Sequence, residues 1–174
     1  MKKKTLILTV FLLVLAGGFS ACKEELKEEP KEEIRKEPEE PEEPKDTSSL
    51  VNTKWKLIGI VDVETESLTE PEPKPNDYDK FYTLTFDTDS TFSGQATNNR
   101  IIPFHSKYEI DYVTRTLLFT AIVTTEAMDL GDGELYRKIL KKIQSFTINN
   151  VHPRQLHLYY DDSKRYLKYN EVGG

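Results

Sequence analysis

A run of two dozen residues with almost no apolar side chains divides this 174-residue chain and confines folding to the residues that follow it. Residues 23 to 46 comprise six basic and twelve acidic side chains, four prolines and two aliphatic residues. Such a segment buries too little apolar surface to offset the entropy of ordering it, and its prolines interrupt any long helix. We expect a solvated tether that reaches about 25–30 Å as a flexible coil. An interaction tail is the alternative.

The residues before the tether have the pattern of an export signal. Three lysines precede an apolar run from Thr5 to Leu15, which is too short to span a bilayer because a spanning helix needs about 20 apolar residues. The sequence Phe19-Ser20-Ala21-Cys22 resembles the lipobox, where a bacterial lipoprotein signal peptidase cuts before an acylated cysteine, although Phe19 replaces the common leucine. We therefore predict a signal peptide at 1–21 and a lipid anchor, such as palmitate and diacylglycerol, on Cys22.

The alternative is that Cys22 is incidental and follows an ordinary signal peptide. It is the only cysteine in the chain, so it cannot form an intramolecular disulfide, and an exported protein rarely keeps one free thiol. The next residues, Lys23-Glu24-Glu25, resemble the surface-export signal of Bacteroidetes lipoproteins. We expect residues 22–46 to hold a domain, residues 47–174, to the outer membrane, facing the extracellular side.

The charge of that domain argues against nucleic acid as a partner. The whole chain carries a net charge of −6, the leader carries three lysines and the tether carries −6, so residues 47–174 carry about −3. Phosphate neutralisation supplies most of the affinity of nucleic-acid-binding proteins, and no basic face is evident here.

Short alternating segments predict that the domain is mainly β. In residues 52–63, Trp55, Leu57, Gly59 and Val61 alternate with Lys54, Lys56, Ile58 and Ile60, which is typical of a strand with one buried face; Trp55 is expected in the core. Residues 80–86 and 91–95 predict one hairpin, and 106–112 and 116–123 predict a second. Residues 96–103 are expected to be irregular.

One helix and three strands complete the predicted domain. Asp132 is a suitable N-cap, and Leu135, Ile139 and Ile143 recur four residues apart on one expected apolar face, beside Tyr136 and Leu140. Strands are expected at 145–149, 155–160 and 165–169. The fold class predicted is therefore a single small antiparallel β-roll or barrel of about eight strands, with one α-helix before the last three strands.

The order of these segments is similar to that of the META domain, also called the HslJ-like family. The similarity covers residues 52–170 and rests on W-x-L, F…F-S-G…N-N, Y-E-I-D-Y…L-L-F, T-T-E, E-L-Y…I-L-K-K-I-Q-S-F-T-I, L-H-L-Y-Y and Y-L-K-Y. It implies a small β-roll in the bacterial envelope without established catalytic residues. Ala96-Thr97-Asn98-Asn99 stands where many members have Gly-Cys-Asn, and no cysteine follows Thr124-Thr125-Glu126, so any role of those cysteines is absent here.

No motif predicts catalysis, a metal or a cofactor. His152 and His157 lack the spacing of two ligands on one helix face, and His157 is expected to be a satisfied histidine in a strand. Residues 129–134 superficially resemble a calcium loop, but they lack its alternating ligands and distant glutamate, so a turn before the helix is expected. We predict that the protein is not an enzyme.

The leading functional hypothesis is a surface-anchored, protein-binding module that inhibits a secreted peptidase. The overall plan is similar to that of potempins, surface lipoprotein inhibitors of oral Bacteroidetes. The candidate partner-binding loop is an exposed, extended, proline-rich segment, for which an ordinary surface excursion is the alternative. Its candidate residues are Glu66, Ser67, Leu68, Thr69, Glu70, Pro71, Pro73, Pro75 and Tyr78.

Two other functions stay open at this point. One is envelope maintenance or stress protection in the periplasm, as in other META-domain proteins. The other is carriage of a small hydrophobic ligand in a barrel mouth, which needs a cavity. The aromatic residues are instead expected to fill the interior, and they are Trp55, Phe81, Phe86, Tyr108, Phe119 and Phe146.

Overall fold

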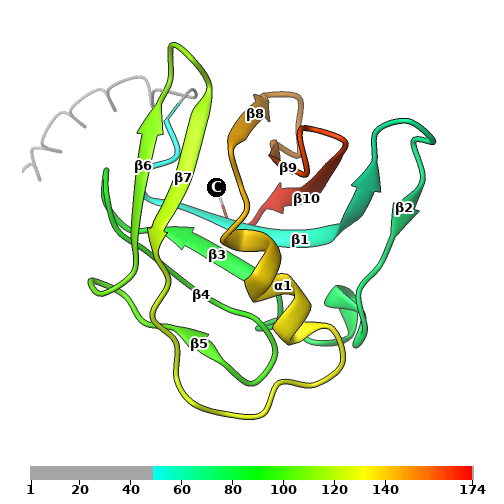
Figure 1. Ribbon diagram of the computed structural model, residues 1–174, viewed down its shortest axis with the longest axis vertical. Helices are drawn as coiled ribbons and strands as arrows, with labels where there is room; N and C mark the ends of the chain where they lie inside the picture. Colours follow the sequence, from blue (N-terminus) through cyan, green and yellow to red (C-terminus); the bar gives the residue numbers. More distant parts are fainter. Residues whose placement is uncertain (1–48, 174) are drawn as a thin grey trace, which may run out of the picture. The chain divides into compact units, whose positions relative to one another are not determined.

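The computed structural model describes residues 49–173 and shows a mainly β domain with one α-helix (Figure 1). The signal peptide, Cys22, Lys23, Glu24, Glu25 and the tether lie outside the described residues. The elements are β1 (Thr53–Asp62), β2 (Leu68–Thr69), a 3-10 turn η1 (Pro75–Asp77), β3 (Thr83–Phe86), β4 (Phe92–Gln95), β5 (Arg100–Ile101), β6 (Lys107–Asp111), β7 (Thr116–Ala121), α1 (Gly133–Leu140), β8 (Ser145–Asn149), β9 (Gln155–Tyr160) and β10 (Arg165–Glu171).

The strands form one antiparallel sheet that curls into a half-barrel. Its order is β5-β4-β3-β1-β10-β9-β8-β7-β6, and β2 pairs with β1 beside this path. Isolated bridges join Thr91 to Lys107 and Ile101 to Thr124, so backbone pairing also links the two ends of the curled sheet. The predicted fold class is confirmed, including both hairpins and the helix before the last three strands. The extra strands are the two-residue β2 and β5, and β5 lies in residues predicted to be irregular.

Aromatic side chains fill the inside of the half-barrel. Trp55 is fully buried, as expected, and its indole N–H donates to Thr53 Oγ1 at 2.7 Å. Phe86, Tyr108 and Phe146 are also buried, whereas Phe81 and Phe119 are only partly buried against this core. These buried side chains occupy the interior, as expected, which argues against carriage of a hydrophobic ligand there.

The predicted alternation of burial along β1 is confirmed, since Trp55, Leu57, Gly59 and Val61 are buried, but a bulge changes which face of the sheet the last residues occupy. The pairing of β1 with β10 shifts between Leu57 and Gly59, which is a β-bulge. A bulge adds one residue and reverses which side chains face the core beyond it. Ile60 therefore lies opposite the core residue Leu167, and Val61 is buried on the other face of the sheet, opposite Tyr166.

The buried face of α1 also differs from the prediction. Tyr136, Ile139 and Leu140 are buried in the core, with Ile143 just after the helix, but Leu135 is 47% exposed. An eight-residue helix on a curved sheet buries a narrow stripe, and Leu135 lies at its edge. Asp132 is the N-cap residue but makes no side-chain cap, because its Oδ2 accepts the backbone N–H of Glu72 at 2.8 Å instead.

The proline-rich segment is not the continuous, exposed, extended loop that was predicted. Leu68 and Thr69 pair with β1, Pro75 begins the turn η1, and Pro71 and Pro75 are buried. The carbonyl of Glu72 accepts hydrogen bonds from the Asp132 N–H at 2.6 Å and the Tyr82 hydroxyl at 2.7 Å. The domain thus holds the middle of this segment.

Among residues 49–173, no helix has the length and hydropathy needed to cross a bilayer.

Candidate functional site

Two polar segments far apart in the sequence meet at one edge of the sheet. The first is the turn at residues 96–99, and the second is the connection between β7 and α1, of which residues 124–130 are here called the pinned loop. The Asn99 side chain donates from Nδ2 to the carbonyl of Ala127 at 2.7 Å, and its Oδ1 accepts the Ala127 N–H at 3.0 Å. Asn98 Nδ2 donates to the carbonyl of Met128 at 2.8 Å. Two asparagines therefore fix the backbone of consecutive loop residues.

Asp129 anchors the same loop through its side chain, which is only 3% exposed. Its Oδ1 accepts the Thr97 hydroxyl at 2.9 Å and the Asn99 N–H at 3.2 Å. Its Oδ2 accepts a hydrogen bond from Arg137 Nε at 2.8 Å and forms an ion pair with Arg137 Nη2 at 2.8 Å. Burial would raise the pKa of the Asp129 carboxyl, but the hydrogen bonds from Asn99, Thr97 and Arg137 outweigh burial and hold that pKa below its usual value. The carboxylate therefore stays charged and paired.

The outer side of the pinned loop is open to solvent. Met128 is 88% exposed and Leu130 is 49% exposed, while the Asp129 side chain between them points into the domain. Beyond its bridge at Thr124, the pinned loop contains no helix, turn or bend. Residues 125–128 and Leu130 are exposed, whereas side chains of the domain hold the backbone of this chain.

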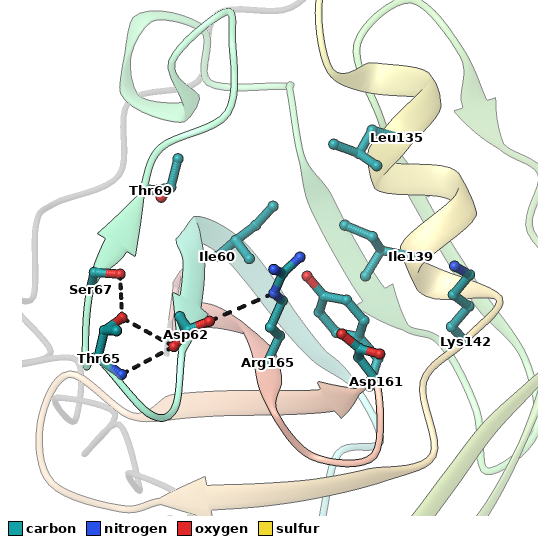
Figure 2. A pocket seen from close by; sticks show the side chains of 11 residues that line it. Ile60, Asp62, Thr65, Ser67, Thr69, Leu135, Ile139, Lys142, Asp161 and Arg165 are labelled. Carbon is teal, nitrogen blue, oxygen red and sulfur yellow. Dashed lines mark hydrogen bonds and ion pairs between the residues drawn. The ribbon is translucent and has the colours of Figure 1, made fainter.

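A second candidate surface is a groove of about 520 Å³ between β2 and α1 (Figure 2). Its apolar wall is formed by Ile60, Leu135 and Ile139. Its polar groups bond mostly to one another: Thr65 Oγ1 donates to Asp62 Oδ1 at 3.0 Å, and Arg165 Nε lies 3.8 Å from Asp62 Oδ2. The groove therefore offers a partner an apolar wall together with the charged side chains of Lys142 and Asp161. The remaining lining residues are Ser67, Thr69, Lys142, Tyr160 and Asp161.

The predicted partner-binding residues are divided among several environments. Ser67 and Thr69 line the groove, and Leu68 lies on the opposite face of β2, over Gly59. Glu70 is exposed and forms an ion pair with Lys74 at 3.4 Å. The others do not form one surface with these: Glu66 is exposed, Pro71 and Pro75 are buried, Pro73 is half-buried, and Tyr78 stacks on Phe81 at 4.5 Å between ring centroids.

His157 lies in strand β9, as expected, but it is not satisfied: among residues 49–173 its buried Nε2 has no hydrogen-bond partner. Its ring packs at 4.5 Å from the ring of Tyr166 on the outer face of the sheet. Burial, with a smaller contribution from Lys168, lowers the pKa of His157. His157 is thus a neutral packing residue there.

Residues 129–134 form the turn before α1, as expected, because Asp129 pairs with Arg137 and Asp132 bonds to Glu72. Within residues 49–173, no three histidine, cysteine, aspartate or glutamate side chains are grouped closely enough to hold a metal ion.

The pinned loop was not predicted as a site, although the sequence contains a signal for it. Thr97 and Asn99 are polar residues between apolar strand segments, and both are buried. Buried polar side chains nearly always have hydrogen-bond partners, so the burial of these two side chains implies that the turn holds another segment. Which segment it holds follows only from the fold.

Comparisons with known proteins show similarity without assigning a family. No family model matches the chain, and the resemblance to the META domain stays a prediction. A Tannerella forsythia protein named "Putative lipoprotein" is 29% identical over 123 residues, which are 70% of this chain and 75% of that protein.

Among solved structures, an NMR structure of a Burkholderia xenovorans protein has a TM-score of 0.55 and 21% identity, covering 72% of this chain and 85% of that one. This likeness shows a shared fold. A crystal structure of a DUF4847 family protein from Bacteroides vulgatus has a TM-score of 0.49 and 17% identity, covering 68% of this chain and 92% of that one.

Proposed function

We propose that the protein is a lipid-anchored, non-enzymatic binding module of the outer membrane whose partner is a secreted peptidase that it inhibits. The anchor is supported by the leader and the lone Cys22, and by the lipoprotein name of the Tannerella forsythia relative. Lys23-Glu24-Glu25 supports an orientation toward the extracellular side.

The observation that carries the binding function is the pinned loop, which is exposed to solvent and yet held by the domain. Hydrogen bonds from Asn98, Asn99 and Thr97 fix its backbone, and Met128 stands out from it. A loop ordered before binding loses less conformational entropy in a complex, so more of the contact energy appears as affinity. Exposed extended chain is also the form in which peptidases bind peptides. This combination supports inhibition over a purely structural role.

The groove between β2 and α1 is the second contact surface in this proposal. Leu135 lies in its wall and is 47% exposed, so a partner side chain that reached the groove would bury apolar area there. Of the predicted partner-binding residues, Ser67 and Thr69 line this groove together.

The anchor and orientation are tested in the bacterium that encodes the chain. Metabolic labelling with a palmitate analogue should label the wild type and not Cys22→Ser. Brief treatment of intact cells with an added protease should remove the protein from the surface. Protection in intact cells but not in lysed cells would contradict the orientation and favour a periplasmic protein.

Inhibition is tested with the purified chain and the culture supernatant of the same bacterium. The protein should slow casein hydrolysis by that supernatant and be recovered in a complex with the peptidase responsible. Unchanged hydrolysis at every inhibitor concentration would contradict the proposed function.

A further inference from the structure

We propose that the pinned loop enters the substrate cleft of the peptidase, and that Met128 fills the pocket for an apolar side chain next to the scissile position. This inference rests on the proposed function and adds the contact residue and the specificity of the partner. The Met128 side chain is 88% exposed, so its packing contributes almost nothing to the stability of the domain. A flexible, unbranched, polarisable side chain is suited to filling an apolar pocket in another protein.

The exposed side chains along the loop indicate which subsites the partner must have. The Asp129 side chain points into the domain, whereas Met128 and Leu130 on either side of it are exposed. Glu126, two residues before Met128, is exposed. The complementary cleft has an apolar pocket for Met128, a second apolar subsite for Leu130, and a polar or basic subsite for Glu126.

The hydrogen bond from Asn98 explains how such a loop could bind without being cut. Hydrolysis of the bond between Met128 and Asp129 adds one water molecule, and the peptidase must stabilise the charge that develops on the Met128 carbonyl oxygen. That oxygen already accepts Asn98 Nδ2 at 2.8 Å. The residues on both sides of this carbonyl are also held: Asn99 bonds to Ala127, and Asp129 pairs with Arg137. The scaffold therefore opposes the carbonyl movement that cleavage requires.

The first experiment measures inhibition constants of the full chain against chymotrypsin and subtilisin, which accept an apolar side chain immediately before the scissile bond, and against trypsin. The wild type should inhibit chymotrypsin or subtilisin and not trypsin. Met128→Glu should weaken that inhibition about tenfold or more, as expected for a central anchor residue, whereas Met128→Leu should change it by about twofold or less. Val113→Glu, at a residue 92% exposed on the β6–β7 hairpin, is the matched control and should have no effect.

Met128→Lys provides a gain-of-function arm, because the pocket of trypsin binds a basic side chain. This variant should lose inhibition of the apolar-pocket peptidases and gain inhibition of trypsin. Inhibition by the wild type that is unchanged in Met128→Glu and Met128→Lys would overturn the inference and leave the proposed function standing. Absence of wild-type inhibition of all three probes and of the culture supernatant would overturn both.

The second experiment tests the carbonyl anchor. Asn98→Ala should become a substrate, with mass spectrometry showing cleavage after Met128 at a rate at least about tenfold above wild type, since tenfold corresponds to one hydrogen bond of about 1.4 kcal/mol. Asn150→Ala, at another exposed asparagine, is the control. Thermal unfolding is measured in parallel. A folded Asn98→Ala variant that resists cleavage as well as the wild type would overturn the proposed role of Asn98.

Discussion

The pinned loop and the proline-rich segment at residues 64–79 are both exposed connections, but the domain holds them in different ways. Buried side chains hold the pinned loop along its length, through Thr97, Asn99 and Asp129. The proline-rich segment is held by β-pairing, at Glu72 and at Tyr78, and its turn around Thr65 bonds to the half-buried Asp62 and to exposed neighbours.

This difference shows that rigidity in a loop depends on its partners more than on its composition. The prolines predicted a stiff, exposed segment. In the structure, however, Pro71 and Pro75 are buried against the domain. The pinned loop contains no proline and is ordered by long-range hydrogen bonds, which are strongest where water is excluded. The following variants are intended to separate the two modes of support.

The largest loss of stability is expected for Asp129→Ala. The change leaves the partly buried Arg137 without its carboxylate and removes the acceptor of Thr97, and breaking a buried pair in this way costs about 3 kcal/mol or more in the free energy of unfolding. Urea denaturation measures it. Glu134→Ala, which removes an exposed ion pair with Lys138, should have little effect, because solvent screens exposed charges. Similar losses for both would contradict the role assigned to Asp129.

The same carboxyl predicts a dependence of stability on pH. The pKa of Asp129 is lower in the folded state, so its contribution is present above the unfolded value of about 3.9 and is lost as the pH falls through the folded value. The stability difference between the wild type and Asp129→Asn should therefore be constant near neutral pH and shrink below about pH 3.9. A difference that grows on acidification would contradict this sign.

Gly131→Ala tests the point where the two regions meet. Gly131 has φ +47°, and an added Cβ would lie 2.2 Å from the Glu72 carbonyl oxygen. Strain and displacement of Glu72 should cost about 2 kcal/mol in thermal or urea unfolding. Gly173 also has positive φ, at +72°, but nothing lies near its Cβ position, so Gly173→Ala is the control for backbone strain alone. Equal effects would show that the close approach to Glu72 is unimportant.

The same substitution in each region compares their support directly. Thr97→Ala removes a buried hydroxyl that bonds to Asp129 and to the Leu130 N–H at 2.9 Å, with an expected cost of about 1.5 kcal/mol. Thr65→Ala removes an exposed hydroxyl and should cost less than about 0.5 kcal/mol. Amide hydrogen exchange should also accelerate at Leu130 in Thr97→Ala. A larger loss from Thr65→Ala would reverse the comparison.

The smallest effect on stability is expected for Leu135→Ala, in the groove wall. Leu135 is 47% exposed, so its truncation should cost less than about 0.5 kcal/mol. Ile139→Ala, four residues along the helix and 5% exposed, should cost about 2 kcal/mol or more. Equal losses of stability from Leu135→Ala and Ile139→Ala would contradict the exposed position of Leu135. They would support the buried helix face that the sequence periodicity predicted.

Much of the fold could be predicted because hairpins and strands depend on neighbouring residues. The alternation of Tyr108 and Ile110 and the turn around Thr114 predicted the β6–β7 hairpin with small errors at its ends. The bulge after Leu57 could not be predicted, because it depends on the register of β1 against β10, more than a hundred residues later. The site was predicted only in part: Ser67 and Thr69 line the groove, but the pinned loop was missed.

The sequence by itself determined the alternation of the strands, the position of the helix, the burial of Trp55 and the single cysteine at position 22, because each depends on local residue type and spacing. The tertiary structure alone decided which exposed segment is rigid. Asn99 and Ala127 are 28 residues apart, and their two hydrogen bonds form only after the two ends of the curled sheet come together. Periodicity within one segment carries no information about such contacts.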